Sequence, residues 1–95
     1  MSTAKVFTSE QAQQTAGKIG LDFSTVEFDM EQFRMGMDTE LEHGNVDPQT
    51  NVTNDDPVLT GKIALAHLRE FPDYYTRLYE MEEEAEAYWD ARKKA

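Results

Sequence analysis

The sequence predicts an all-α fold: a compact single-domain bundle of about four helices, with a long, ordered polar loop between the second and third helices. Three observations support this fold class. Signals that begin and end helices alternate four times along the 95 residues. Apolar residues between these signals recur at spacings of three and four. Residues 21–29 alternate like a strand, but no second strand is available to pair with them. The length suits one domain, 1–95, in which residues 1–7 and 93–95 are expected to be loosely held.

The first helix is predicted between Thr8 and Gly20. Thr8 can cap it, because Gln11 follows three residues later as in a capping box, and Gly20 is suited to end it. The apolar face of this helix is thin. The next segment, residues 21–29, is interpreted as a connector that buries four apolar side chains: Leu21, Phe23, Val26 and Phe28.

The second helix is predicted to begin at Asp29 and to end at Gly44, directly after His43. Asp29 is a good cap, with Gln32 at the reciprocal position of a capping box. Spacings of three and four place the apolar residues of this helix on one face. They are Met30, Phe33, Met37 and Leu41.

A polar loop, residues 44–56, separates the second and third helices. Its Asp, Asn and Thr side chains can hydrogen-bond the local backbone, so we expect an ordered loop packed against the third helix. Asp56 and Pro57 are suited to start that helix as cap and first-turn residue, and Pro72 to stop it. The run IALAHL is apolar around most of the helix circumference. This pattern predicts that the third helix is central and most buried.

The fourth helix is predicted from Tyr74 nearly to the end of the chain, with Asp73 as its cap. Its apolar stripe is formed by Leu78, Met81, Ala85 and Tyr88, with Trp89 beside them. Amphipathic aromatic side chains are enriched at protein interfaces. The predicted interface comprises Tyr75, Tyr79, Glu83 and Trp89. The alternative is that these aromatic residues pack against the thin apolar face of the first helix.

The formal charge of the chain is -10, from 19 acidic and 9 basic residues. This charge disfavours direct binding to nucleic acid, whose affinity for proteins comes largely from basic side chains, and it disfavours anionic membrane surfaces for the same reason. It favours solubility, and it also suits a basic protein partner. No cysteine is present, which excludes thiolate zinc sites and cysteine nucleophiles. Neither a signal-peptide pattern nor a membrane-spanning run is found, so we expect a cytoplasmic protein.

The two histidines are the residues that could carry chemistry. Glu40 and His43 share one face of the second helix, and His67 and Glu70 share one face of the third. Brought together, these four would suit zinc, iron or manganese. We favour the alternative that they are structural: the helix dipole stabilises His43, while His67 hydrogen-bonds a buried partner and pins the loop. No nucleophile or oxyanion hole accompanies them, so no catalytic residue is assigned and no resident cofactor is expected.

Four segments in order, ELEHG, TNVTNDDP, GKIALAHL and EFPDYYTRL, resemble a family of small acidic bacterial and phage proteins catalogued as a domain of unknown function. The likeness extends over residues 7–86 and is strongest between Phe33 and Met81. It implies a small helical domain that occurs in phage or bacterial genomes. It implies no activity and supplies no catalytic residues.

The function expected from the sequence is a noncatalytic protein-interaction module associated with phage. It would be a small accessory component of the virion or an acidic inhibitor of a host factor. Its partner would be another protein or further copies of itself, in a bacterial or phage-infected cell or in the virion. The alternative is a metal-binding protein or small metalloenzyme that uses His43 and His67 with Glu40 and Glu70.

Overall fold

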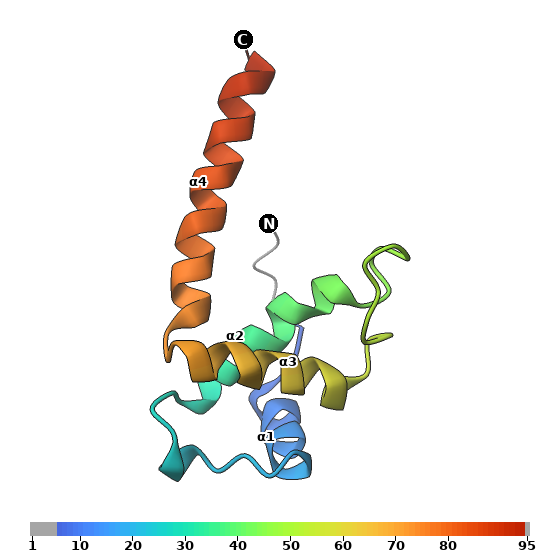
Figure 1. Cartoon of the computed structure of the whole chain (residues 1–95), viewed down its shortest axis with the longest axis vertical. Coiled ribbons are helices and arrows are strands. Elements are labelled where there is room, and N and C mark those ends of the chain that lie inside the picture. Colours follow the sequence, from blue (N-terminus) through green and yellow to red (C-terminus); the bar gives the residue numbers. More distant parts are fainter. Residues whose placement is uncertain (1–5, 95) are drawn as a thin grey trace.

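The computed structural model describes residues 6–94, which form four α-helices and two short 3₁₀ turns and contain no strand. The helices are α1 (Ser9–Lys18), α2 (Met30–Glu40), α3 (Pro57–Glu70) and α4 (Tyr74–Lys94), and the turns span Phe23–Thr25 and Leu41–His43. The first three helices cross one another in a small body, and α4 leaves this body as a long rod (Figure 1). The predicted all-α fold is confirmed.

Each of the first three helices begins at its predicted cap, where a side-chain oxygen accepts a backbone N–H. These caps are Thr8, Asp29 and Asp56. Gln11 completes the predicted capping box by accepting the backbone N–H of Thr8. The reciprocal position predicted for Gln32 is wrong, because its side-chain amide donates to Thr76 Oγ1 on α4 instead. Gln32 thus links α2 to α4 and does not take part in capping α2.

The hydrophobic core lies where α2 crosses α1 and α3. Its buried side chains include Ala12, Ala16, Phe28, Phe33, Met37, Ala64, Leu68 and Tyr75. Six of the eleven residues of α2 are buried, whereas four of the fourteen residues of α3 are. The prediction that the third helix is central is therefore wrong, and α2 holds that position. Hydropathy understates the burial of α2 because three of its buried residues are polar: Arg34, Thr39 and Glu40.

Two glycines let the helices approach closely. A Cβ atom at Gly36 of α2 would lie 2.5 Å from Cε2 of Tyr75, and one at Gly61 of α3 would lie 2.7 Å from Cγ2 of Thr15. A side chain at either position would force these neighbouring side chains to move. Gly36 thus allows the Tyr75 ring, at the start of α4, to lie directly against α2.

The segment before α1 is tied to α2 by a network of ion pairs. The backbone N–H of Phe7 donates to Asp38 at 2.8 Å, and the Phe7 carbonyl accepts from Arg34 at 3.3 Å. Arg34 also pairs with Asp38 and Glu31, both at 2.7 Å. The hydrogen bond to Glu31 is the main cause that raises the pKa of Arg34. Phe7 is buried, so the expected loose segment does not include it; residues 1–5 and 95 lie outside the described chain.

The connector between α1 and α2 is anchored at both its polar and its apolar residues. Asp22 accepts from the backbone N–H and the hydroxyl of Ser24, and these hydrogen bonds lower the pKa of its carboxyl. Phe28 is buried, while the other three predicted side chains are half-buried. The ring of Phe23 contacts that of Phe33 edge to face at 6.0 Å between centroids. The predicted anchoring of this connector is therefore confirmed for Phe28 and in part for the rest.

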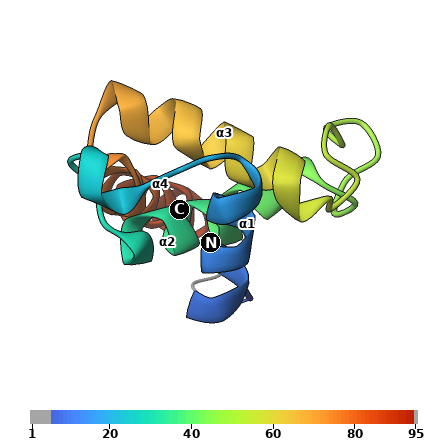
Figure 2. The same ribbon diagram turned by 90° about the horizontal axis from the view of Figure 1, so that it is seen from below.

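The polar loop, residues 44–56, is held by hydrogen bonds but lies mostly outside the body. The carbonyl of His43 accepts the backbone N–H groups of Val52 and Thr53, and Asp55 accepts that of Asn45. Within the loop only Gly44 and Thr53 are buried. Figures 1 and 2 show it extending beyond the end of α3 that is remote from α4. The predicted order is present, but the prediction that the loop packs along the third helix is wrong.

The last helix, α4, has two unlike halves. Its first half packs against α2 and α3 through the buried ring of Tyr75. From Glu83 to Lys93 every side chain is exposed, and the helix extends away from the body (Figure 1). The prediction that the aromatic residues of this helix pack on the first helix is wrong for Tyr88 and Trp89, which are 50% and 60% exposed. Among residues 6–94, no helix combines the length and the apolar character needed to cross a membrane.

Candidate functional site

A buried carboxylate lies where α2, α3 and α4 meet. Glu40, the last residue of α2, is 3% exposed. The hydroxyl of Tyr75 donates a hydrogen bond to its Oε2 at 2.8 Å. Burial, followed by the charge of Glu40, raises the pKa of Tyr75 far above the ordinary tyrosine value. Tyr75 therefore remains a protonated donor at neutral pH and satisfies a carboxylate that burial would otherwise destabilise.

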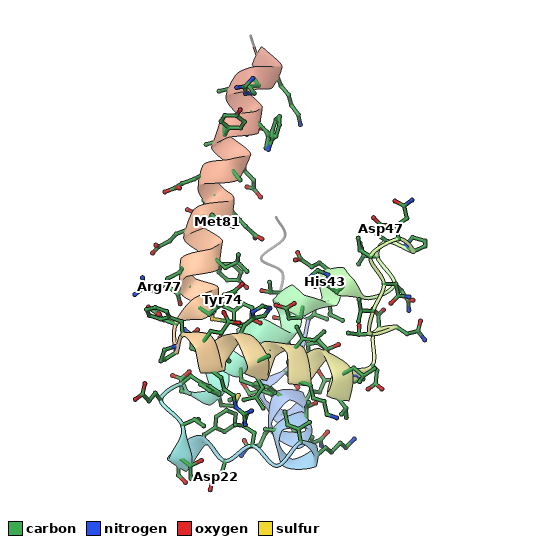
Figure 3. The ribbon with its side chains drawn as sticks, in the orientation of Figure 1. Asp22, His43, Asp47, Tyr74, Arg77 and Met81 are labelled. Atoms are coloured by element: carbon green, nitrogen blue, oxygen red, sulfur yellow. The ribbon has the colours of Figure 1, made fainter. Side chains whose placement is uncertain are left out.

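Both histidines approach this carboxylate from the solvent side. Nε2 of His43 lies 3.7 Å from Oε1 of Glu40, and Nε2 of His67 lies 3.7 Å from Oε2. These separations are longer than hydrogen bonds. The His67 ring stacks on Tyr74 at 4.5 Å between centroids, and its Nδ1 is buried without a hydrogen-bond partner. Figure 3 shows His43 and Tyr74 on the side of the body from which α4 rises.

The structure brings together three of the four predicted metal ligands. Glu40, His43 and His67 converge, whereas Glu70 is exposed on α3 and forms no ion pair with either histidine in the described chain. Within residues 6–94, no three His, Asp or Glu side chains form a group that could hold a metal ion. The loop is held by the backbone carbonyl of His43, not by His67, which belongs to the corner between α3 and α4.

Carboxylates dominate the electrostatics of this corner. Burial, and then the charges of Glu40, Glu70, Glu42 and Glu82, raise the pKa of Tyr74. Burial and the charge of Glu42 raise the pKa of Glu82, whose Oε2 is buried without a hydrogen-bond partner. The arrangement offers acceptors and protonated tyrosines but no activated nucleophile. Its effect is to fasten α4 to the body through one buried polar contact.

The second candidate is an apolar surface along α4. We define the α4 stripe as six residues that follow one another at spacings of three and four: Tyr74, Leu78, Met81, Ala85, Tyr88 and Arg92. Met81 is 55% exposed and Tyr88 50% exposed. An open hollow of about 310 Å³ lies at the foot of the stripe, the end nearest the body. It is lined by Phe71, Tyr74, Arg77, Leu78 and Met81.

Two arginines lie over aromatic rings at the two ends of the stripe. The guanidinium of Arg77 lies 4.3 Å from the ring centroid of Phe71, and that of Arg92 lies 4.5 Å from that of Tyr88. Arg77 points outward from α4 in Figure 3. Such contacts keep the two cations beside the aromatic rings of this surface.

The predicted interface residues do not lie on one surface. Tyr75 has no exposed area, so it is not available to a partner and its assignment to the interface is wrong. Tyr79 is half-buried, with its hydroxyl bonded to Thr39. Glu83 is exposed, on the face of α4 opposite the stripe. Trp89 is 60% exposed and borders the stripe, in edge-to-face contact with Tyr88.

The interface prediction omitted the residues of the hollow, above all Phe71 and Met81. Met81 lies in the spacing 74, 78, 81, 85, 88 and 92, which is the a and d pattern of a heptad repeat, and Phe71 extends this series by three residues toward the N-terminus. The side that packs on the body is marked mainly by Tyr75 and Tyr79, about a third of a turn away, and Tyr74 and Leu78 of the stripe are half-buried against the core.

Comparison with known proteins identifies a family for this chain. Residues 12–84 match the family described as Protein of unknown function (DUF5661). The match covers most of the chain, which therefore belongs to this family, and the predicted membership of a family of unknown function is confirmed. No curated protein and no solved structure matches it.

Proposed function

We propose that this protein is a noncatalytic protein-interaction module that docks through the α4 stripe. The observation that carries the proposal is the exposure of Met81, Tyr88 and Trp89 on a helix that extends beyond the body. Large apolar side chains scattered singly on a surface need no explanation. Here they follow one another along one helix and continue into the hollow at its foot.

The stability of α4 gives a second reason. Helices of 12–15 residues or fewer are marginal in water when nothing packs against them. Residues 83–93 of α4 have only exposed side chains, so contacts with the body do not support this part of the helix. A partner that covers the stripe would bury its apolar area and stabilise this part of the helix. Tyrosine, tryptophan and arginine, which border or form the stripe, are the residue types that dominate binding energy at interfaces.

The biological setting is proposed from the resemblance and from the charge. The resemblance to bacterial and phage proteins supports a phage-associated role in a bacterial or phage-infected cell or in the virion. The formal charge of -10 supports association with proteins and not with nucleic acid. Either role, an accessory component of the virion or an acidic inhibitor of a host factor, would place a protein partner on this surface.

Site-specific photo-crosslinking tests this proposal. A photoreactive phenylalanine analogue replaces Tyr88 on the stripe or, in the matched control, Glu83 on the opposite face. We expect irradiation in the native host to give one defined cross-linked protein from position 88 and none from position 83. Mass spectrometry of the product identifies the partner, including a second copy of this chain. Equal products from both positions, or none from position 88, would overturn the proposal.

A further inference from the structure

The α4 stripe has the spacing of a short coiled-coil seam. Leu78, Met81, Ala85 and Tyr88 are separated by three, four and three residues, and Tyr74 and Arg92 extend the series in both directions. From Tyr74 to Arg92 the seam is about 27 Å long at a rise of about 1.5 Å per residue. The body contacts the helix mainly at Tyr75 and Tyr79, and Tyr74 and Leu78 at the foot of the seam are half-buried against the core. From Met81 outward the seam is exposed, and Leu78 still lines the open hollow, so a second helix can reach the seam along this length.

We propose that the occupant of this seam is the α4 stripe of a second copy of the chain, bound antiparallel, so that the protein forms a symmetric dimer. This inference rests on the proposed function, because it names the partner of the same surface. The observation behind it is that the spacings of three and four residues along the stripe follow the same order in both chain directions. Antiparallel coiled coils place a positions opposite d positions, with knobs from each helix in holes of the other.

One antiparallel register pairs every layer of the seam. When Met81 of one copy lies opposite Ala85 of the other, Leu78 lies opposite Tyr88 and Tyr74 lies opposite Arg92. A large side chain then meets a small one in the central layers, as close packing requires. In the outer layers the Tyr88 side chain enters the hollow beside Leu78. The two-fold axis passes between these layers, so each contact occurs twice.

Charge favours the antiparallel over the parallel orientation. In a parallel pair, Arg92 would lie against its own copy and both bodies would crowd at one end. In the antiparallel pair, Arg92 reaches Tyr74, whose pKa is raised by burial and by the field of four carboxylates, and a cation is stabilised in such a field. Lys93 comes level with Asp73, and Glu70 is exposed nearby. The basic tip of each α4 therefore meets the acidic corner of the other copy.

The size of the seam and its central charges predict a weak dimer. A specific interface buries about 1,000 Å² or more. A strip about 27 Å long and about 10 Å wide on each of two helices covers about 540 Å² in total, roughly half of this minimum. Glu82 and Glu84 flank the central layers, so like charges approach each other across the two-fold axis. The dimer is therefore expected to dissociate on dilution.

Cysteine cross-linking tests the partner and the register together, because the native chain contains no cysteine. Three single variants are prepared in the full chain: Met81→Cys, Ala85→Cys and Glu83→Cys. All three positions are exposed, so the fold is expected to survive, and circular dichroism verifies this. We expect an equimolar mixture of M81C and A85C to oxidise to the mixed disulfide several-fold faster than either variant alone.

The control and the outcomes separate this inference from the proposed function. E83C lies at the same height as the two-fold axis but on the outer faces, so it should form disulfides at the slow rate of random collision. Fast disulfide formation by A85C alone would indicate a parallel pair and would overturn the antiparallel register. Equal slow rates for all variants, with a monomer in sedimentation equilibrium, would overturn self-association. In that case a different protein cross-linked from position 88 would leave the proposed function intact.

Discussion

The second helix buries charged residues, whereas the fourth helix leaves large apolar residues exposed. Helix α2 is half the length of α4, yet it buries six residues, among them Arg34 and Glu40. Each of these charges has a partner: Arg34 pairs with Glu31 and Asp38, and Glu40 accepts from Tyr75. Helix α4, in contrast, leaves Met81 and Trp89 more than half exposed.

This contrast shows that hydropathy alone does not locate the core of this protein. The charges of α2 are stabilised inside the fold because hydrogen bonds and ion pairs compensate for their desolvation. The apolar residues of α4 remain outside because the body covers only one side of its first half. We infer that α2 determines the stability of the monomer and that the α4 stripe determines association. Four substitutions test this division, from the largest expected effect to the smallest.

Replacing Phe33 should cause the largest loss of stability. Its ring is completely buried and lies close to Gly61 of α3 and Phe23 of the connector. Phe33→Ala is expected to lower the free energy of unfolding by about 3–5 kcal/mol, because it removes buried area and leaves a cavity. Urea denaturation followed by circular dichroism measures the change. In the matched control, Phe71→Ala, the ring is 48% exposed and the loss should stay below about 1 kcal/mol. Similar losses for both would contradict the division.

Removing the hydroxyl of Tyr75 should have the next largest effect. Tyr75→Phe leaves Glu40 buried without its hydrogen bond and is expected to cost about 1–3 kcal/mol. If this bond is the cause, adding Glu40→Gln to the variant should recover part of the loss. A cost that is unchanged in the double variant would indicate a packing effect instead.

The pH dependence of the same variant follows from the raised pKa of Tyr75. Folded Tyr75 keeps its proton above pH 10, where an unfolded tyrosine releases it. The free energy of unfolding should therefore fall as the pH rises above about 10. Tyr75→Phe should make this fall shallower, and the remainder should come from Tyr74, whose pKa is also raised. An equally steep fall in the variant would refute this assignment.

Replacing Glu82 should change the free energy of unfolding by a smaller amount and in the opposite direction. Because burial and Glu42 raise its pKa, the folded state disfavours its ionised form, so its contribution is unfavourable at neutral pH and vanishes in acid. Glu82→Gln is expected to stabilise the protein by up to about 1 kcal/mol at pH 7. The gain should disappear below about pH 4, where the carboxyl is protonated in both states. Thermal melts at the two pH values measure this, with Glu83→Gln as the exposed control.

Trp89 should contribute least to the stability of the monomer. Its indole is 60% exposed and contacts only its neighbour Tyr88 among the aromatic rings described. Trp89→Ala should change the free energy of unfolding of the dilute monomer by less than about 0.5 kcal/mol. The same variant should weaken association, since this side chain borders the seam. A large loss of stability in dilute solution would place Trp89 in the fold and not at the interface.

Much of the fold could be predicted from local signals. The caps Thr8, Asp29 and Asp56 and the stop at Pro72 are properties of a few neighbouring residues, and the structure agrees with each. The central position of α2 could not be predicted in this way. It depends on Tyr75 reaching Glu40 from 35 residues away and on Gly36 leaving room for that ring. Neither the hydrogen bond from Tyr75 to Glu40 nor the close approach at Gly36 can be recognised from neighbouring residues in the sequence.

The candidate sites show the same limit. The sequence placed Glu40 and His43 on one face of the second helix, because spacings within a helix fix which residues share a face. The position of His67 at 3.7 Å from Glu40 depends instead on how α2 and α3 pack together. The sequence did not exclude Glu70, since the rotation of α3 about its own axis depends on packing with α2. The spacing of the α4 stripe was also visible in the sequence. Which side of α4 faces the body was not, because that side is chosen by Tyr75 and Tyr79.

Hydrogen–deuterium exchange at increasing protein concentration tests the central claim most directly. The claim is that the outer half of α4 is a docking surface that a second copy covers. We expect backbone amides of residues 83–93 to exchange rapidly in dilute protein and to become protected as the concentration rises, while those of α2 remain protected throughout. Rapid exchange of residues 83–93 that is independent of concentration, up to the solubility limit, would contradict the claim.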